Sequence, residues 1–405
     1  MTTATMSMTH SRAVPGLERV AFALLLCFVA SLQISIAAAH ILLSLMLVCW
    51  VAVLVQEKTL RSVPRFFWPL AAYAGVTLLV SAVSVDPRAS VIDDKQLVLF
   101  LIVPVVYQIA RSERASVVID VIVSVGAASA AYGIVQYGLL HYDNLGRRPE
   151  GAMSHYMTYS GLLMLVICAA AARLIFGRRA RTWPALVMPA LVVALALTLG
   201  RSAWIGASVA VALLLALKNV RLTALLPVFI AVLFAIAPGT VTDRVKSIFD
   251  VQDPTNQDRL AMVEIGARII TDRPLTGVGP NMIPRVYADY RPDYAVNPVN
   301  PHLHNVPLQI AAERGLPALA IWIWFVGSLT AALVRLFRAG ASTPLGTGPD
   351  RVPAAAALAA VAAMLSAGLF EYNVGDSEFL MLFLVLVTLP FAAARGDDAA
   401  STARA

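Results

Sequence analysis

Apolar stretches of about membrane length recur along the whole chain. A helix needs about 20 mostly apolar residues to cross the hydrocarbon core of a membrane. About twelve such stretches occur in the 405 residues, and the mean hydropathy is +0.76. A soluble domain cannot bury that much apolar surface in one core, so the sequence predicts an all-α integral membrane protein. The predicted spans are 17–35, 36–55, 67–84, 96–110, 116–140, 156–176, 183–200, 202–217, 220–237, 316–337, 353–370 and 378–394.

Basic residues in the short loops predict the orientation of these spans. Short loops rich in Lys and Arg stay in the cytoplasm. With the N-terminus inside, every inner loop is basic, and an even number of spans returns the C-terminus to the cytoplasm. More membrane helices follow the first stretch, so we expect it to be a span and not a signal peptide. The inner loops then hold Lys58, Arg61, Arg65, Arg111, Arg114, Arg178, Arg179, Arg181, Lys218, Arg221, Arg335, Arg338 and Arg351.

A second set of basic residues lies on the predicted outer side, where the topology does not require them. The chain carries a formal net charge of +7, and this set contributes to it. Arginines placed against the topological bias suggest an anionic ligand. The set consists of Arg147, Arg148, Arg201, Arg244, Lys246, Arg259, Arg268, Arg273, Arg285, Arg291 and Arg314. We expect Arg244, Lys246 and Arg285 to be solvated or to face lipid phosphates, and Arg201 has the alternative of reaching the outer headgroups.

One long outer segment divides the chain. Residues 1–238 hold the first nine predicted spans, 239–315 form an outer segment, and 316–405 hold three spans and a tail. Loops of this length without structure are uncommon, so we expect short helices in the segment. "TNQDRLAMVEIGARIITDRP" predicts an amphipathic helix near the membrane surface, with Thr255 or Asn256 as N-cap. Its apolar stripe consists of Leu260, Val263, Ala267 and Ile270.

The end of the outer segment carries two histidines before a membrane helix, in "NPHLHNVPLQIAAERG". Asn305 is a suitable cap for the helix that follows, with Pro307 in its first turn. His304 then lies at the positive end of the helix dipole, which disfavours the imidazolium form. This arrangement makes His304 a candidate general base. The alternative is that His302 and His304 only form a turn at the membrane interface.

Three segments together resemble the O-antigen ligase and polymerase superfamily. "HNVPLQIAAERGLPAL" is similar to its His-Asn, Leu-Gln, Glu-x-Gly stretch, and "LGRSAWIGA" to its outer Arg turn. "DRLAMVEIGARIITDRPLTGVGPNM" resembles its Arg-led helix followed by Pro-Leu-x-Gly-x-Gly, although Met262 or Val263 replaces the usual aromatic residue. The resemblance implies a GT-C-like bundle with a large periplasmic loop, in the bacterial inner membrane. Its ligase branch transfers polysaccharide from undecaprenyl diphosphate to a lipid A-core acceptor at the periplasmic face.

The candidate residues suit that reaction. A glycosyl diphosphate departs as an anion, so it needs charge neutralisation, and the guanidinium fork fits phosphate oxygens. We therefore expect Arg201 and Arg259 to bind the diphosphate and His304 to act as base, with inversion, without a metal and without a cofactor. Further substrate contacts are predicted at Arg147, Arg148, Tyr156, His302 and Asn305. For Tyr156 the alternative is the interfacial aromatic belt.

The sequence also allows other functions, but it offers no convincing metal site. Neither Asp93 with Asp94, Asp250 with Asp253, nor the histidine pair has a convincing ligand set for a metal. The expected partners are the lipid-linked glycan, the lipid A-core acceptor and membrane lipids, and no nucleic acid. An O-antigen polymerase, a protein O-oligosaccharyltransferase and, in another class, a polyprenyl-glycan flippase or transporter stay as alternatives. Transporters usually place ionisable residues at mid-membrane, whereas here the charges lie at the outer side.

Overall fold

The computed structural model describes residues 15–57, 62–178, 181–248, 250, 252–342 and 350–402. These residues form helices and contain no strand. Lys58, Arg61 and Arg179, predicted for inner loops, lie outside them. Six of the helices are long and apolar enough to cross a membrane, so the chain is a multi-pass membrane protein. They are α2 (Ile36–Glu57), α6 (Arg114–Gly138), α7 (Tyr156–Phe176), α9 (Arg201–Lys218), α14 (Val306–Ser342) and α16 (Ser377–Thr402).

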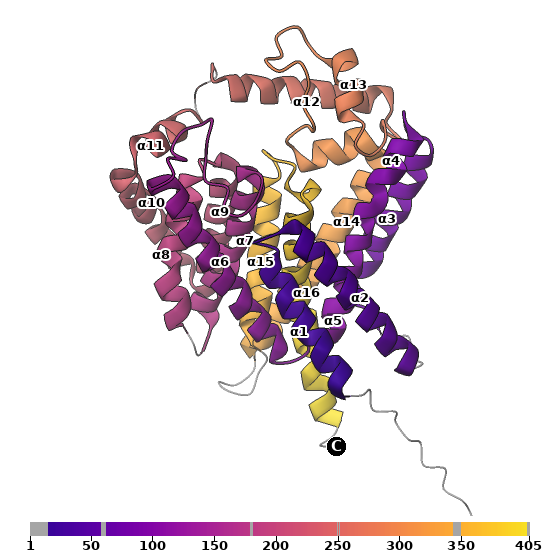
Figure 1. The fold of residues 1–405 in the computed structure, drawn as a ribbon, viewed down its shortest axis with the longest axis vertical. Helices are drawn as coiled ribbons and strands as arrows, with labels where there is room; N and C mark the ends of the chain where they lie inside the picture. Colours follow the sequence, from indigo (N-terminus) through magenta and orange to yellow (C-terminus); the bar gives the residue numbers. More distant parts are fainter. Residues whose placement is uncertain are drawn as a thin grey trace, which may run out of the picture.

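The other six predicted spans are also helical, but their helices are shorter or divided. Figure 1 shows them running beside the long helices. They are α1 (Pro15–Ser31), α3 (Phe67–Ala82), η1 (Asp94–Leu101) with α5 (Ile102–Ile109), α8 (Thr182–Leu197), η2 (Val220–Ala224) with α10 (Leu225–Ile236), and α15 (Arg351–Ala367).

The segment formed by η1 and α5 shows how a short stretch can reach membrane length. Both helices have eight residues, but η1 is a 3-10 helix. A 3-10 helix rises about 2.0 Å per residue and an α-helix about 1.5 Å, so the pair extends over roughly 28 Å. That is close to the thickness of the hydrocarbon core, about 30 Å. Eight residues are an unusually long run for a 3-10 helix.

The core of the bundle is built around α7, α15 and α16. α15 packs against α7, α9, α14 and α16, and nearly all of its residues are buried. Alanine is the main residue of α15, and its small side chain allows neighbouring helices to approach closely. Large apolar side chains on the outer helices remain exposed, for example Val48, Leu79 and Ile236 at 67%, 72% and 75%. An exposed apolar surface of this extent is typical of a lipid-facing protein.

Short helices cover one end of the bundle. They are α4 (Pro87–Asp93), α11 (Gly239–Lys246), α12 (Pro254–Asp272) and α13 (Ile283–Tyr290). In Figure 1, α12 lies across the upper end of the bundle, with α13 beside it. Away from these helices, Arg351 at the start of α15 stacks on Phe176 and Phe337, near the C-terminal ends of α7 and α14.

The predicted amphipathic helix is confirmed as α12, but its cap differs from the prediction. The N-cap is Asp253, whose carboxylate accepts hydrogen bonds from the backbone of Thr255 and Asn256. Pro254 occupies the first turn, which favours a start of the helix before the predicted cap residues. The helix packs through Ala261, Met262, Ile265 and Ile269, whereas the predicted stripe residues Leu260 and Val263 are 62% and 50% exposed.

α12 is joined to α14 through three glycines. Gly315 interrupts α14 with φ 79°, and a Cβ there would lie 2.2 Å from the carbonyl oxygen of Leu275. At Gly277, with φ 61°, an added Cβ would clash in the same way with the carbonyl oxygen of Ala312. The backbone N–H groups of Val278 and Gly279 donate to Ala312 and Glu313. The Pro-Leu-x-Gly-x-Gly stretch therefore fits against the kink of α14 at Gly315. This stretch and the Glu-x-Gly motif of α14 hold one another in position.

Candidate functional site

A tight turn presents His302 and His304 at the start of α14. The Gln309 side chain accepts a hydrogen bond from Leu303 N at 2.7 Å and is itself buried. Asn305 Oδ1 accepts from Leu308 N at 2.9 Å, so Asn305 caps the helix as predicted. Its Nδ2 donates to Leu369 O at 3.0 Å. The Asn and Gln of the motif thus fix the histidine turn, and Asn305, predicted to contact substrate, uses both side-chain atoms within the protein.

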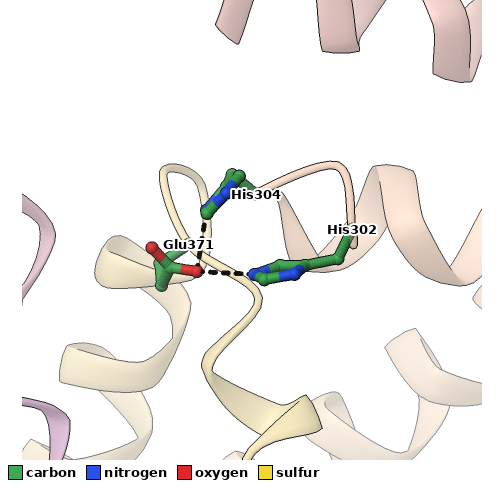
Figure 2. Close-up of side chains that lie close together, drawn as sticks. All are labelled: His302, His304 and Glu371. Carbon is green, nitrogen blue, oxygen red and sulfur yellow. Dashed lines mark hydrogen bonds and ion pairs between the residues drawn. The ribbon is translucent and has the colours of Figure 1, made fainter. Parts of the chain in front are cut away.

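Glu371, from the loop between α15 and α16, joins the two histidines (Figure 2). Its Oε1 lies 2.8 Å from His304 Nδ1 and 3.1 Å from His302 Nε2. The centroids of the two imidazole rings lie 4.2 Å apart. Sequence reasoning did not identify Glu371, although an acid in the short link "LFEYN" between two apolar spans was a usable signal.

The carboxylate of Glu371 is buried and remains ionised. Burial by itself would raise its pKa, but the hydrogen bonds from His302 and His304 hold the pKa well below the usual range. Its Oε2 has no hydrogen-bond partner among the described residues. Glu371 therefore keeps a negative charge next to His304 Nδ1, where it can orient the ring and stabilise the imidazolium that forms when His304 takes a proton.

The backbone of His304 is strained, with φ at 47°. A non-glycine residue in this left-handed region costs about 1–3 kcal/mol and persists only where the surroundings impose it. Here the surroundings are the helix cap at Asn305 and the bond to Glu371. Strain of this kind is often found at functional sites.

The same three residues form a possible metal-binding group. His302, His304 and Glu371 each offer one ligand atom, and these atoms lie within 4.8 Å of one another. The sequence offered no convincing ligand set around the histidine pair, and the structure adds Glu371 as a third potential ligand from a loop 67 residues further along the chain. Two nitrogens and one carboxylate oxygen are a common catalytic zinc set.

Arg201 lies at the start of α9 and is only 5% exposed. Its Nη1 donates to Ser247 O and Oγ at 3.0 and 3.1 Å, and its Nη2 to Asn256 Oδ1 at 3.0 Å. A guanidinium held in this way is not an interfacial anchor that reaches the lipid headgroups, so that alternative does not fit. Arg201 instead connects α9 to the start of α12.

Arg244 was expected to be solvated or to face lipid, and this expectation was wrong. It is 9% exposed and forms an ion pair with Asp253 at 3.5 Å, while Arg201 lies 3.8 Å from the same carboxylate. Burial alone would raise the pKa of Asp253, but the bond from Thr255 and the charges of Arg201 and Arg244 hold it below its usual value. One carboxylate thus faces two buried arginines.

Arg259 and Arg148 add two positive charges that no direct ion pair among the described residues offsets. Arg259 forms no hydrogen bond or ion pair with the part of the chain that the structure describes. Arg148 donates Nε to Leu145 O and stacks on the Tyr156 ring at 4.1 Å. Burial lowers the pKa of both arginines, and the charge of Arg244 lowers it further. We define Arg148, Arg201, Arg244 and Arg259 as the arginine cluster.

The arginine cluster adjoins the histidine turn. Asp258, next to Arg259 on α12, accepts hydrogen bonds from Asn297 and Asn300, in the segment that leads into the histidine turn. Among the described residues, Arg201 and Arg244 pair with Asp253, and Arg148 and Arg259 form no ion pair, so the cluster has an excess of positive charge. A multiply charged anion that bridges Arg148 and Arg259 would relieve this excess.

Several other predicted residues lie apart from this site. Asp93 and Asp94 line a separate cavity of about 70 Å³ together with Arg314 and Tyr372. Arg314 is buried against Glu313 at 2.8 Å. Arg285 pairs with Asp86, and Lys246 with Asp243, and both basic side chains are largely exposed, as expected. Arg147 is exposed and stacks on Tyr142 at 4.2 Å instead of joining the arginine cluster.

Comparison with known families identifies part of the chain. Residues 186–323 match the family model described as O-antigen ligase. This range includes Arg201, Arg244, Arg259, His302 and His304, whereas Arg148 and Glu371 lie outside it. No curated protein matches the chain in sequence.

Proposed function

We propose that this chain, which belongs to the O-antigen ligase family through residues 186–323, is a ligase of lipopolysaccharide assembly. In this proposal it transfers polysaccharide from undecaprenyl diphosphate to a lipid A-core oligosaccharide at the periplasmic face of the bacterial inner membrane. The observation that carries the proposal is the excess positive charge of the arginine cluster beside the His304–Glu371 pair. The arginine cluster suits a leaving diphosphate, and the His304–Glu371 pair suits proton removal from an acceptor.

The proposed reaction is a single displacement. His304 takes the proton of the acceptor hydroxyl, whose oxygen forms a bond to the anomeric carbon of the donor. The bond from that carbon to the diphosphate breaks, and undecaprenyl diphosphate leaves as an anion held by Arg148 and Arg259. One displacement inverts the configuration at the anomeric carbon. Because the leaving group already departs as an anion, charge neutralisation replaces a general acid.

The proposed membrane arrangement follows from the distribution of basic residues among the predicted loops. We infer twelve GT-C-like spans, with both termini in the cytoplasm and the end covered by α12 in the periplasm. Support comes from the twelve predicted segments, all of which are helical, and from Arg351, which stacks on Phe337 near the end of α14, whereas the stretch after α12 binds near the start of α14.

A ligation assay tests the function directly. The purified protein would be mixed with undecaprenyl-diphosphate-linked glycan and lipid A-core, and the products separated by mass. Covalent glycan on lipid A-core is the expected result. A longer lipid-linked glycan would indicate a polymerase, and glycan transfer to an added pilin would indicate a protein O-oligosaccharyltransferase. Relocation of the donor across liposomes without any covalent product would indicate a flippase.

Replacing Arg259 by alanine should weaken donor binding. Arg259 offers an uncommitted guanidinium, and a hydrogen bond to a charged group contributes about 1.5–3 kcal/mol. We therefore expect the Kd for undecaprenyl diphosphate to rise roughly 10- to 150-fold. The matched control is Arg268→Ala on the same helix, where the arginine pairs with Glu264 and is exposed. Equal affinity of the Arg259→Ala and Arg268→Ala proteins would contradict the role of Arg259.

Transfer should continue after chelation of divalent metals. Fixed arginines supply the positive charge that a metal otherwise supplies to a diphosphate. The assay compares ligation by purified protein in excess EDTA with ligation after Mg²⁺, Mn²⁺ or Zn²⁺ is restored. Activity that disappears on chelation and returns with one metal would point instead to the group of His302, His304 and Glu371 as its site.

A further inference from the structure

The loop between α6 and α7 forms a pocket that the proposed roles leave unused. The pocket has a volume of about 270 Å³, close to the lower end of small-molecule sites, roughly 300–1,000 Å³. It lies on the same side of the bundle as the arginine cluster, with which it shares Arg148. Its polar lining consists of Tyr142, Arg147, Arg148, Glu150, His155 and Tyr156.

The loop is held in place by buried contacts. The Gln136 side chain is buried, accepts hydrogen bonds from Glu150 N and Gly151 N at 3.0 and 2.8 Å, and donates to Gly151 O at 2.8 Å. Gly151 has φ 61°, and a Cβ there would lie 2.6 Å from the Tyr159 ring. Asn144 Oδ1 accepts from the backbone of Gly146 and Arg147 and closes the tip. The pocket is thus preformed.

The pocket presents the groups that recognise hydroxyls. The Glu150 carboxylate forms no hydrogen bond or ion pair among the described residues, so it can accept from a ligand. His155 uses Nδ1 to accept from Met157 N, which leaves Nε2 for a ligand. Stacking on Tyr142 and Tyr156 fixes the guanidinium planes of Arg147 and Arg148. One acceptor, one imidazole nitrogen and two donor forks are a set that can hold several hydroxyls of one ring.

We propose that this pocket is a saccharide subsite that holds the sugar ring bonded to the diphosphate of the donor. This inference rests on the proposed function. Arg148 belongs both to the pocket and to the arginine cluster. Three residues after His155, the Thr158 hydroxyl donates to Asp376 Oδ2 at 3.0 Å, in the same α15–α16 loop that carries Glu371. The pocket therefore lies next to both the proposed diphosphate site and the proposed base. The anomeric carbon of the donor must lie between these two groups, so its ring enters the neighbouring pocket.

Binding measurements with three probes test this inference. The purified wild-type protein and a Glu150→Gln variant would be titrated with undecaprenyl diphosphate, with undecaprenyl-diphosphate-linked glycan and with lipid A-core. Gln keeps the size of the side chain but removes the charged acceptor. We expect the Kd for the glycan-bearing donor to rise about 10-fold, and the Kd for undecaprenyl diphosphate to stay unchanged. Asp143→Asn, in the same loop but outside the pocket lining, is the matched control.

The outcomes separate the subsite from the function. Weaker binding of lipid A-core by Glu150→Gln, with normal binding of the glycan donor, would mean that the pocket holds the acceptor saccharide and not the donor ring. Unchanged affinity for both saccharide probes would overturn the subsite and leave the proposed function standing. If the wild-type protein does not bind undecaprenyl diphosphate at all, the proposed function itself fails.

Discussion

The His304→Ala protein should bind lipid-linked donor normally and lose nearly all transfer. His304 is the proposed base, and its ring is held by the Glu371 carboxylate at 2.8 Å. Loss of a positioned general base costs about 10²–10⁴-fold in rate. Transfer would be measured with purified protein and saturating donor and acceptor, and donor affinity in a separate titration. Transfer by His304→Ala at near the wild-type rate would exclude the role of base.

A second variant separates chemistry from folding at this position. His304 has φ 47°, and asparagine tolerates this conformation better than alanine does. His304→Asn should therefore keep the turn and the cap of α14, yet it cannot act as a base near neutral pH. If both variants are well folded and both lack transfer, loss of the imidazole is the cause. Restored transfer in His304→Asn would show that the turn conformation, not the imidazole, is required.

Replacing Glu371 by glutamine should reduce transfer by about 10²–10⁴-fold while the protein stays folded, as expected when an imidazole base loses the carboxylate that orients it. Its ionised form contacts both His302 and His304. The pKa of Glu371 lies below its usual value, so the carboxylate is charged throughout pH 5–8 and its contribution to stability is lost only below that range. Glu371 is thus a positioning residue that acts through His304.

The pH profile distinguishes this role from simple packing. Removing the negative charge makes protonation of the neighbouring imidazole harder, so the acid limb of the rate profile should move to lower pH in Glu371→Gln. Glu378→Gln, an acid in the first turn of α16, is the control and should keep the wild-type profile. A loss of rate with no movement of the acid limb would assign Glu371 to structure alone.

The helical segments could be predicted because lipid imposes a simple rule. Every backbone group in the hydrocarbon must be satisfied locally, so apolar stretches of sufficient length become helices. That rule does not predict the 3-10 form of η1 or the kink of α14 at Gly315, because both depend on packing between distant segments. The exposed Leu260 and Val263 show the same limit, since apolar periodicity identifies a face but not its partner.

The candidate site was predictable only in part. His304 and Arg259 occur in recognisable motifs, and the positive end of the helix made the histidine a reasonable base. Arg244 has no local pattern that distinguishes it from an ordinary loop charge, and the acid between two apolar spans marks Glu371 without indicating its partners. Their roles depend on which elements meet: α11 meets α9 through Asp253, and the α15–α16 loop meets the histidine turn. Contacts between distant segments carry no signal in one sequence.

The order in which the chain is made has a consequence for when this site can exist. Arg148, Arg201, Arg259 and His304 emerge from the ribosome before Glu371, which belongs to the link between α15 and α16. The His304–Glu371 contact, and the bond from Val306 N to Gly368 O beside it, cannot form until α15 has been inserted. A nascent chain can thus assemble its arginine cluster early, but it stays unable to complete the base until α15 has been inserted.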